Sequence, residues 1–220
     1  MSQLPLDLGH PTALSAGDFL VAPCNAEAHA WLARWRDWPG PASVIFGPAG
    51  CGKTHLAHLF AAATGAGSII AADLGIDDPP RLLDAAALVV EDCDQGGLDE
   101  TALFHLINLA RENGRFLLLT GRQPPSRWTV ALPDLRSRLL AMTALAIGAP
   151  DDQVLAALLV KLFADRQLKV GEEVVAYLLG RMERSFAAAA RLVDRLDRAA
   201  LAGHRAVTVP LARAVLDVEE

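Results

Sequence analysis

Residues 47–54 read Gly47-Pro48-Ala49-Gly50-Cys51-Gly52-Lys53-Thr54, a complete G-x-x-x-x-G-K-T sequence. It lies between an apolar strand candidate at 43–46 and a helix candidate at 53–64. In this context the glycines let backbone N–H groups surround a phosphate, Lys53 reaches the β- and γ-phosphate oxygens, and the Thr54 hydroxyl can bind Mg²⁺. The sequence therefore predicts a phosphate-binding loop between a strand and a helix.

Apolar segments alternate with helical segments on both sides of this loop. The segment 25–37 has helical spacing of Ala28, Trp31, Leu32 and Trp35, and 100–112 is a second helical stretch. Four further strand candidates follow the loop, at 68–72, 87–90, 115–120 and 142–147. Alternating strands and helices predict an α/β fold with a parallel five-stranded sheet covered on both faces.

The pattern changes after Pro150, where only helices are predicted. They begin near Asp151, Gly171, Ser185 and Thr208, which are residues typical of helix starts. The predicted domains are a tail at 1–17, a nucleotide-binding core at 18–149 and an all-helical domain at 150–220.

Composition restricts the functional classes. The net charge is −6, and residues 151–220 contain ten Lys or Arg against eleven Asp or Glu, so direct sequence-specific DNA binding is not expected. Three scattered cysteines fit reduced thiols. Neither a signal peptide nor a membrane span is apparent, and we expect a cytoplasmic protein.

An acidic pair follows a second strand. A phosphate-loop protein needs a carboxylate at the end of a neighbouring strand to hold the Mg²⁺ shell and orient the attacking water. Leu88-Val89-Val90 is followed by Glu91 and Asp92. We assign Glu91 to the metal side and Asp92 to catalysis.

This set of motifs resembles the AAA+ ATPases, and more narrowly the core of the replication initiator DnaA and the related Hda family, over nearly the whole chain. The resemblance implies an adenine-side segment at 18–25, with Leu20, Val21 and Asn25 near the base. It also implies that His55, which follows the phosphate loop, and Thr120, at the end of the sensor-1 strand, contact the nucleotide, and that the helical domain is an AAA+ lid.

The segment 132–139 resembles the family's S-R box. By resemblance its second arginine, Arg138, is an arginine finger that acts on ATP held by a neighbouring AAA+ protein. The alternative is a surface arginine near a helix end that interacts with the helix dipole or with a salt-bridge partner. The neighbour is either DnaA or a second copy in a homodimer, and the sequence leaves both open.

The N-terminal peptide Gln3-Leu4-Pro5-Leu6-Asp7-Leu8 resembles the Q-L-x-L-x-L motif by which Hda docks on the DNA polymerase sliding clamp. Gln3 supplies both a donor and an acceptor, and Leu4, Leu6 and Leu8 can enter apolar pockets. An apolar tail without a partner is the alternative.

Three positions depart from the family pattern. Glu91 stands where Asp is usual, Arg122 where sensor 1 has Asp, and Ala187 where sensor 2 has Arg. Arg184 or Arg191 could replace the missing guanidinium, although solvated surface arginines are the simpler interpretation. These departures predict slow intrinsic ATP hydrolysis.

Three functions remain open. The first is an Hda-type regulator that binds ADP or ATP with Mg²⁺, ADP being expected, and promotes hydrolysis of initiator-bound ATP. The second is an autonomous AAA+ ATPase or helicase-loader-like protein, and the third is a small-molecule kinase.

Within the phosphate loop, the Cys51 thiol has either a pKa depressed by the helix N-terminus or only a side chain small enough to fit.

Overall fold

The structure is a computed structural model that describes residues 19–203 and 205–217. A five-stranded parallel sheet forms the core, in the order β2-β3-β4-β1-β5. Its strands are β1 (Ala42–Phe46), β2 (Gly67–Ile70), β3 (Ala87–Glu91), β4 (Phe116–Gly121) and β5 (Thr143–Ala146). The predicted α/β fold with a parallel five-stranded sheet is confirmed.

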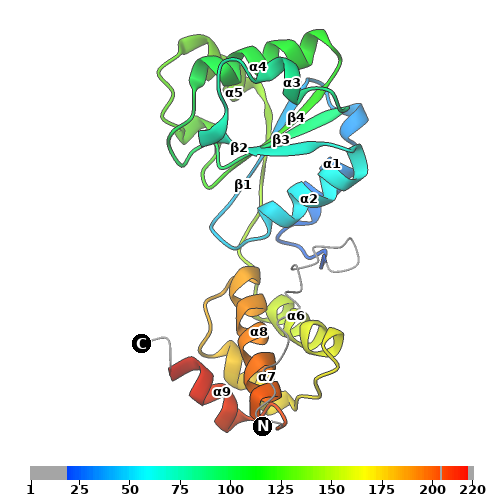
Figure 1. Cartoon of the computed structure of the whole chain (residues 1–220), viewed down its shortest axis with the longest axis vertical. Helices are drawn as coiled ribbons and strands as arrows, with labels where there is room; N and C mark the ends of the chain where they lie inside the picture. Colours follow the sequence, from blue (N-terminus) through cyan, green and yellow to red (C-terminus); the bar gives the residue numbers. More distant parts are fainter. Residues whose placement is uncertain (1–18, 204, 218–220) are drawn as a thin grey trace, which may run out of the picture.

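Helices cover both faces of this sheet (Figure 1), so β3 and β4 are apolar up to their carboxyl ends. Leu88 and Val90 of β3 pack with α3 (Pro79–Leu82), α4 (Glu100–Glu112) and α5 (Pro133–Ala141). Val89 lies on the opposite face with α1 (Ala26–Ala33) and α2 (Lys53–Thr64). Alternate residues of one strand thus enter two different apolar clusters.

Two predicted elements differ from the structure by two residues or more at one end. The helix expected over 25–37 ends at Ala33, and a separate 3-10 turn, η2 (Trp35–Asp37), follows it. That turn lets Trp35 and Trp38 both contact the ring of Phe60 on α2. Strand β2 ends at Ile70, because η3 (Ala71–Asp73) turns Ala71 into the core.

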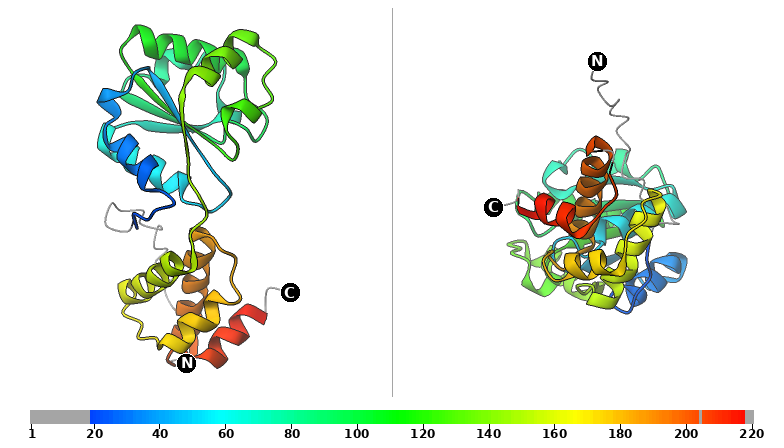
Figure 2. Two further views of the ribbon diagram at one scale, coloured as in Figure 1. Left: turned by 180° about the vertical axis from the view of Figure 1, so that it is seen from behind. Right: turned by 90° about the horizontal axis from the view of Figure 1, so that it is seen from below.

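The helical domain after β5 has its own apolar core. It consists of α6 (Asp152–Asp165), α7 (Glu172–Leu179), α8 (Phe186–Gly203) and α9 (Val209–Leu216), which enclose buried side chains such as Leu159, Phe163 and Leu196. One extended segment connects β5 to α6 (Figure 2). Among the described helices, none combines the length and the apolar composition that crossing a membrane requires.

Candidate nucleotide-binding site

The carboxyl ends of β1, β3 and β4 meet at one edge of the sheet, because β4 lies between the other two strands and all are parallel. The phosphate loop follows β1, the acidic pair ends β3, and Thr120 and Gly121 end β4. The Gly47 N–H donates to the Gly121 carbonyl at 3.2 Å. The fold therefore brings three motifs that are far apart in the sequence to one site.

Left-handed glycines shape the phosphate loop. Gly50 has φ +71° and Gly52 has φ +101°, a region that favours glycine. Lys53 is only 8% exposed, and its Nζ donates to the carbonyls of Gly47 at 2.8 Å and Pro48 at 2.9 Å. The ammonium thus lies inside the curve of the loop, while Thr54 is exposed at the start of α2.

Cys51 is not an activated thiol. Its side chain is 1% exposed, and burial raises its pKa although the charge of Lys53 lowers it. The interpretation of a depressed pKa is therefore wrong. The Sγ atom fills a tight space beside Gly47, where an added Cβ would lie 2.9 Å from it.

Asn25 organises the adenine-side segment. Its side chain is 2% exposed, accepts the Ala22 N–H at 2.8 Å and donates to the Leu20 carbonyl at 3.0 Å. Leu20 itself packs against the apolar core of the helical domain, and Val21 is 50% exposed. Asn25 therefore fixes the backbone of this segment, and its side-chain amide is engaged within the chain.

Phe19 connects the same segment to two helices. Its ring stacks on His29 of α1 at 5.6 Å and meets the edge of His55 of α2 at 5.0 Å between ring centroids. The sequence singled out His55 as a continuation of the phosphate loop. The structure places its ring beside the adenine-side segment.

At the acidic edge, Asp92 has a strained backbone with φ +59° and an exposed side chain. Its N–H donates to the Oγ1 atom of buried Thr120 at 3.0 Å. Glu91, at the end of β3, is half-buried. Thr120 thus supports the turn that presents the acidic pair, a contact that its sequence position did not indicate.

Asp94 was missed by sequence reasoning. Its carboxylate accepts the Arg122 N–H at 2.9 and 2.8 Å and the Gln123 N–H at 2.7 Å. Burial raises the pKa of Asp94, but these N–H groups and the side chain of Gln95 lower it further, so that the net pKa is below its ordinary value. This carboxylate holds the loop after β4, where Arg122 has an exposed side chain.

The lid contacts the phosphate loop through the start of α8. Ser185 caps this helix by accepting the Ala188 N–H at 3.1 Å, and the Ala187 N–H donates to the Gly50 carbonyl at 3.4 Å. A Cβ at Gly50 would lie 2.8 Å from Ser185 and 3.3 Å from the Cβ of Ala187. Ala187 thus lies directly against the loop and brings no cationic group there.

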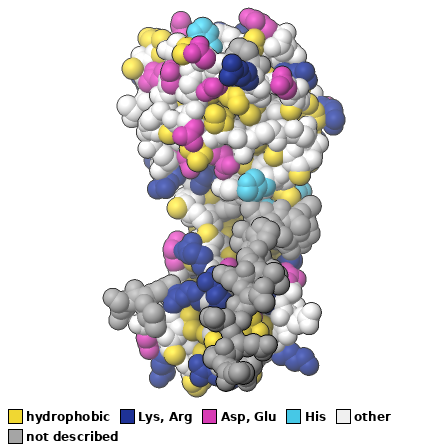
Figure 3. Space-filling view, viewed as in Figure 1, with side chains coloured by type: hydrophobic (Ala, Val, Ile, Leu, Met, Phe, Trp, Pro, Cys, Tyr) yellow, Lys and Arg dark blue, Asp and Glu magenta, His cyan; other side chains and the backbone are white. Residues whose placement is uncertain are grey.

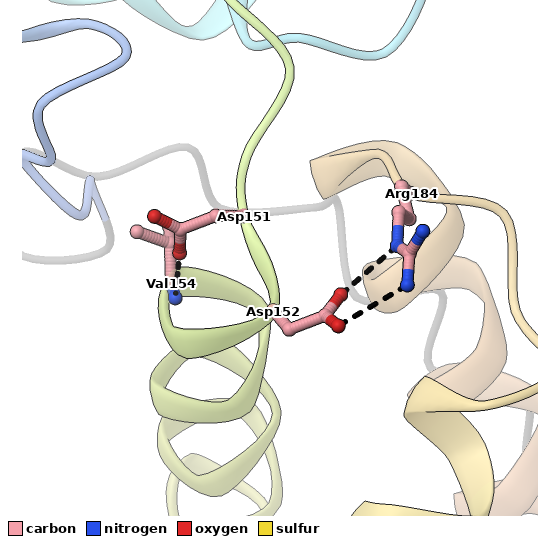
Figure 4. A network of polar contacts seen from close by, with 4 residues as sticks. All are labelled: Asp151, Asp152, Val154 and Arg184. Atoms are coloured by element: carbon pink, nitrogen blue, oxygen red, sulfur yellow. Dashed lines mark hydrogen bonds and ion pairs between the residues drawn. The ribbon is translucent and has the colours of Figure 1, made fainter.

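The two lid arginines are engaged elsewhere. Arg184 makes a two-point contact with Asp152 of α6, at 2.9 and 3.1 Å, as Figure 4 shows. Arg191 lies 3.8 Å from Glu183, and both of these side chains are 66% exposed. This arrangement supports the interpretation of surface arginines, and the contact of Arg184 with a nucleotide stays a prediction.

Arg138 lies in another part of the core. It is half-buried on α5, with its guanidinium carbon 4.6 Å from the ring centroid of Phe104 on α4. Figure 1 shows α4 and α5 at the end of the core away from the lid, whereas α2 and its loop face the lid. Helix α5, which carries Arg138, and helix α2, which follows the phosphate loop, thus pack on opposite faces of the sheet.

The donor atoms at the phosphate loop fit Mg²⁺. Mg²⁺ prefers oxygen ligands and is held by one or two protein groups together with substrate phosphates and water. The Thr54 hydroxyl and the Glu91 carboxylate are groups of this kind. Within 19–203 and 205–217 there is no cluster of three or more His, Cys, Asp or Glu residues that could hold a metal without such help.

The face of the molecule drawn in Figure 3 carries acidic and basic side chains interspersed over the core. A uniform basic patch of the kind that follows a nucleic-acid backbone is not seen on this part of the core. The predicted clamp-docking residues Gln3, Leu4, Leu6 and Leu8 lie outside the described residues.

Known proteins share this architecture. Residues 151–216 match the family model described as Hda, lid domain. Domain III of the Thermotoga maritima replication initiation protein DnaA has a TM-score of 0.75 at 17% identity, with 98% of each chain covered. DnaA bound to AMPPCP and single-stranded DNA has a TM-score of 0.69 at 19% identity, with 86% of this chain and 65% of that chain covered.

The Thermotoga maritima RuvB Holliday junction branch migration motor is also similar, with a TM-score of 0.69 at 16% identity over 89% of this chain and 66% of that chain. At these identities the structural similarity establishes the fold, which is that of the AAA+ proteins. The match of residues 151–216 to the Hda lid model confirms the resemblance for that part of the chain.

Proposed function

Because the chain has the fold of DnaA domain III and carries an Hda-type lid, we propose that it is a regulatory inactivator of the initiator DnaA. It binds an adenine nucleotide, ADP in its working state, at its own phosphate loop. Its N-terminal peptide docks on the sliding clamp, and Arg138 acts on ATP held by DnaA.

The position of Arg138 is the observation that carries this proposal. Its helix lies at the opposite end of the core from its own phosphate loop (Figure 1). With its helix on the other side of the sheet from the helix that follows its own phosphate loop, Arg138 is available to a nucleotide held by another molecule. In phosphoryl transfer such a residue stabilises the charge of the transition state.

The nucleotide at the chain's own site mainly sets a conformation. Lys53 and the loop N–H groups hold the phosphates, and Asn25 fixes the segment that faces the base. Bound Mg²⁺ would neutralise phosphate charge, with Thr54 and Glu91 as its protein ligands. The sensor-2 position is Ala187, so this site lacks one guanidinium that would stabilise developing charge.

An autonomous ATPase is the second candidate, since Lys53, Thr54, Glu91 and Asp92 are all present at the same sheet edge. The two functions differ in turnover. The regulator hydrolyses its own ATP far more slowly than about one per second, the lower part of the usual range for enzymes. A faster rate for the isolated chain favours the autonomous ATPase.

The test measures hydrolysis of DnaA-bound ATP in the presence of DNA-loaded clamp and ADP. Wild-type protein stimulates it, and Arg138→Ala lowers the stimulation about a hundredfold or more, since fingers contribute about 10³–10⁵ where they act. The matched control is Arg111→Ala, which removes an exposed arginine from the end of α4 and leaves the stimulation unchanged. Equal stimulation by Arg138→Ala and wild type refutes the proposal.

A second arm of this experiment tests the clamp. The double variant Gln3→Ala/Leu4→Ala loses clamp binding in a pull-down and loses the clamp-dependent part of the stimulation, while ADP binding stays intact. Undiminished clamp binding by this variant removes the N-terminal peptide from the proposal and leaves the role of Arg138 to be judged separately.

A further inference from the structure

Helix α4 contacts α5 at two places: the residues just before α5 begins, and Arg138. The two carboxylate oxygens of Glu100 accept the N–H groups of Ala131 at 2.9 Å and Leu132 at 2.6 Å. One turn further along α4, the ring of Phe104 lies 4.6 Å from the guanidinium carbon of Arg138. Positions four residues apart share one face of a helix, so one face of α4 supplies both contacts.

The contact of Glu100 determines where α5 begins. Leu132 is the N-cap of this helix and supplies no side-chain cap, and Pro133 has no N–H to be satisfied. The two N–H groups immediately before the helix are therefore bound by one carboxylate. A charge-assisted contact of this kind fixes the direction in which the helix leaves the loop.

The contact of Phe104 determines where the guanidinium lies. An arginine side chain has many rotamers, and a free one seldom points in the direction that catalysis needs. A guanidinium above an aromatic ring is attracted by the negative face of that ring. Phe104 is itself partly buried against the apolar cluster that α4 and α5 form on the sheet, so packing restricts the movement of its ring.

We propose that Phe104 is a positioning residue for Arg138, with its ring holding the guanidinium in the orientation in which it meets the partner's nucleotide. Glu100 fixes the direction in which α5 begins, and Phe104 fixes the orientation of the Arg138 side chain. This inference rests on the proposed role of Arg138 as a finger. It adds a residue that contacts no nucleotide and whose effect passes through the arginine.

The test compares Phe104→Leu, which keeps an apolar side chain but has no aromatic face, with Phe104→Tyr, which keeps the face. At saturating concentration of the regulator, Phe104→Leu lowers the stimulation of DnaA-bound ATP hydrolysis roughly two- to fivefold, the range of an exposed cation–π contact. Phe104→Tyr retains it. The unfolding midpoint of each variant reports whether the core is intact.

A second readout is independent of hydrolysis. In nitrogen-15 NMR spectra the Nε–H signal of Arg138, identified by its loss in Arg138→Ala, carries a ring-current shift in wild type and Phe104→Tyr that is absent in Phe104→Leu. Phe104→Leu in an Arg138→Ala background has no additional effect on the stimulation.

The outcomes separate the two ideas. A normal stimulation by Phe104→Leu, with a large loss in Arg138→Ala, overturns the role of Phe104 and leaves the proposed function standing. Equal losses in Phe104→Leu and Phe104→Tyr overturn the aromatic contact and show that Phe104 only packs. Full stimulation by Arg138→Ala refutes the finger itself, whatever the NMR signal shows.

Discussion

Gly50 is a residue of the phosphate loop at which the core touches the lid. Its φ of +71° is unfavourable for any side chain with a Cβ, and that Cβ would meet Ser185 at 2.8 Å. Gly65, at the end of α2, has a φ of +70° and no neighbour within 4 Å of an added Cβ. The two glycines share the backbone strain but differ in their surroundings.

We therefore expect Gly50→Ala and Gly65→Ala to behave differently. Gly65→Ala lowers the free energy of unfolding by about 1 kcal/mol through left-handed strain and leaves ADP affinity unchanged. Gly50→Ala costs about 1–3 kcal/mol more and weakens ADP binding at least tenfold, because α8 must move away from the loop. Urea unfolding and calorimetric titration with ADP measure both effects. Equal behaviour of the two variants contradicts a lid contact at Gly50.

At the scale of single residues, the phosphate loop is the part of the site whose geometry is local, and its nucleotide contacts stay a prediction. The sequence spacing alone predicts that Lys53 reaches into the phosphate loop, since the loop is local. Cys51 was ambiguous, and only its burial shows that desolvation outweighs the adjacent Lys53. Asp94 and Phe104 were not found, because their partners are 28 to 34 residues away in the sequence.

Among the elements, α4 follows the acidic end of β3 in the chain and contacts Arg138 of α5 and the residues just before that helix. Asp99 caps it, because the Oδ1 atom accepts the N–H groups of Thr101 and Ala102, each at 2.9 Å. The next residue is Glu100, which binds the start of α5. The cap residue Asp99 and Glu100, which binds the start of α5, are thus neighbours at the beginning of α4.

We expect Asp99→Ala to lower the free energy of unfolding by about 1 kcal/mol, the usual cost of losing such a cap. Asp99→Asn is the matched control, because its side-chain oxygen still accepts and its effect stays within a few tenths of a kcal/mol. Urea unfolding followed by circular dichroism measures the difference. Identical stabilities of the two variants exclude a contribution from this cap.

The elements were predicted where periodicity or an apolar run marks them, as in the strands of the parallel sheet. The ends of the elements were predicted less accurately than their positions. The pattern of 25–37 continues through the break at Arg34, because Trp35 keeps the helical spacing although η2 presents it from a different turn. A tertiary contact of Trp35 and Trp38 with Phe60, which local periodicity does not encode, ends α1 early.

The whole molecule contains separate apolar cores in the AAA+ core and in the lid, joined by one segment. All four tryptophans, Trp31, Trp35, Trp38 and Trp128, lie in the AAA+ core. Tryptophan fluorescence therefore reports the core alone, while helical circular dichroism reports both parts.

We expect Leu159→Ala, at a fully buried position of α6, to destabilise the lid by about 2–5 kcal/mol. Part of the helical signal is then lost at lower urea than the tryptophan transition. Leu103→Ala, at a fully buried position of α4, instead moves the tryptophan transition. Coincident transitions in Leu159→Ala, at every urea concentration, contradict independent cores.

The sequence by itself determined the phosphate loop, the parallel α/β sheet and the helical lid, because local spacing and apolar periodicity carry that information. Only the tertiary structure decided that α8 lies against Gly50, that Arg184 pairs with Asp152 and that Phe104 lies beneath Arg138. These contacts join elements that are distant in the chain. Their formation depends on how the strands order and the helices pack, which no local pattern specifies.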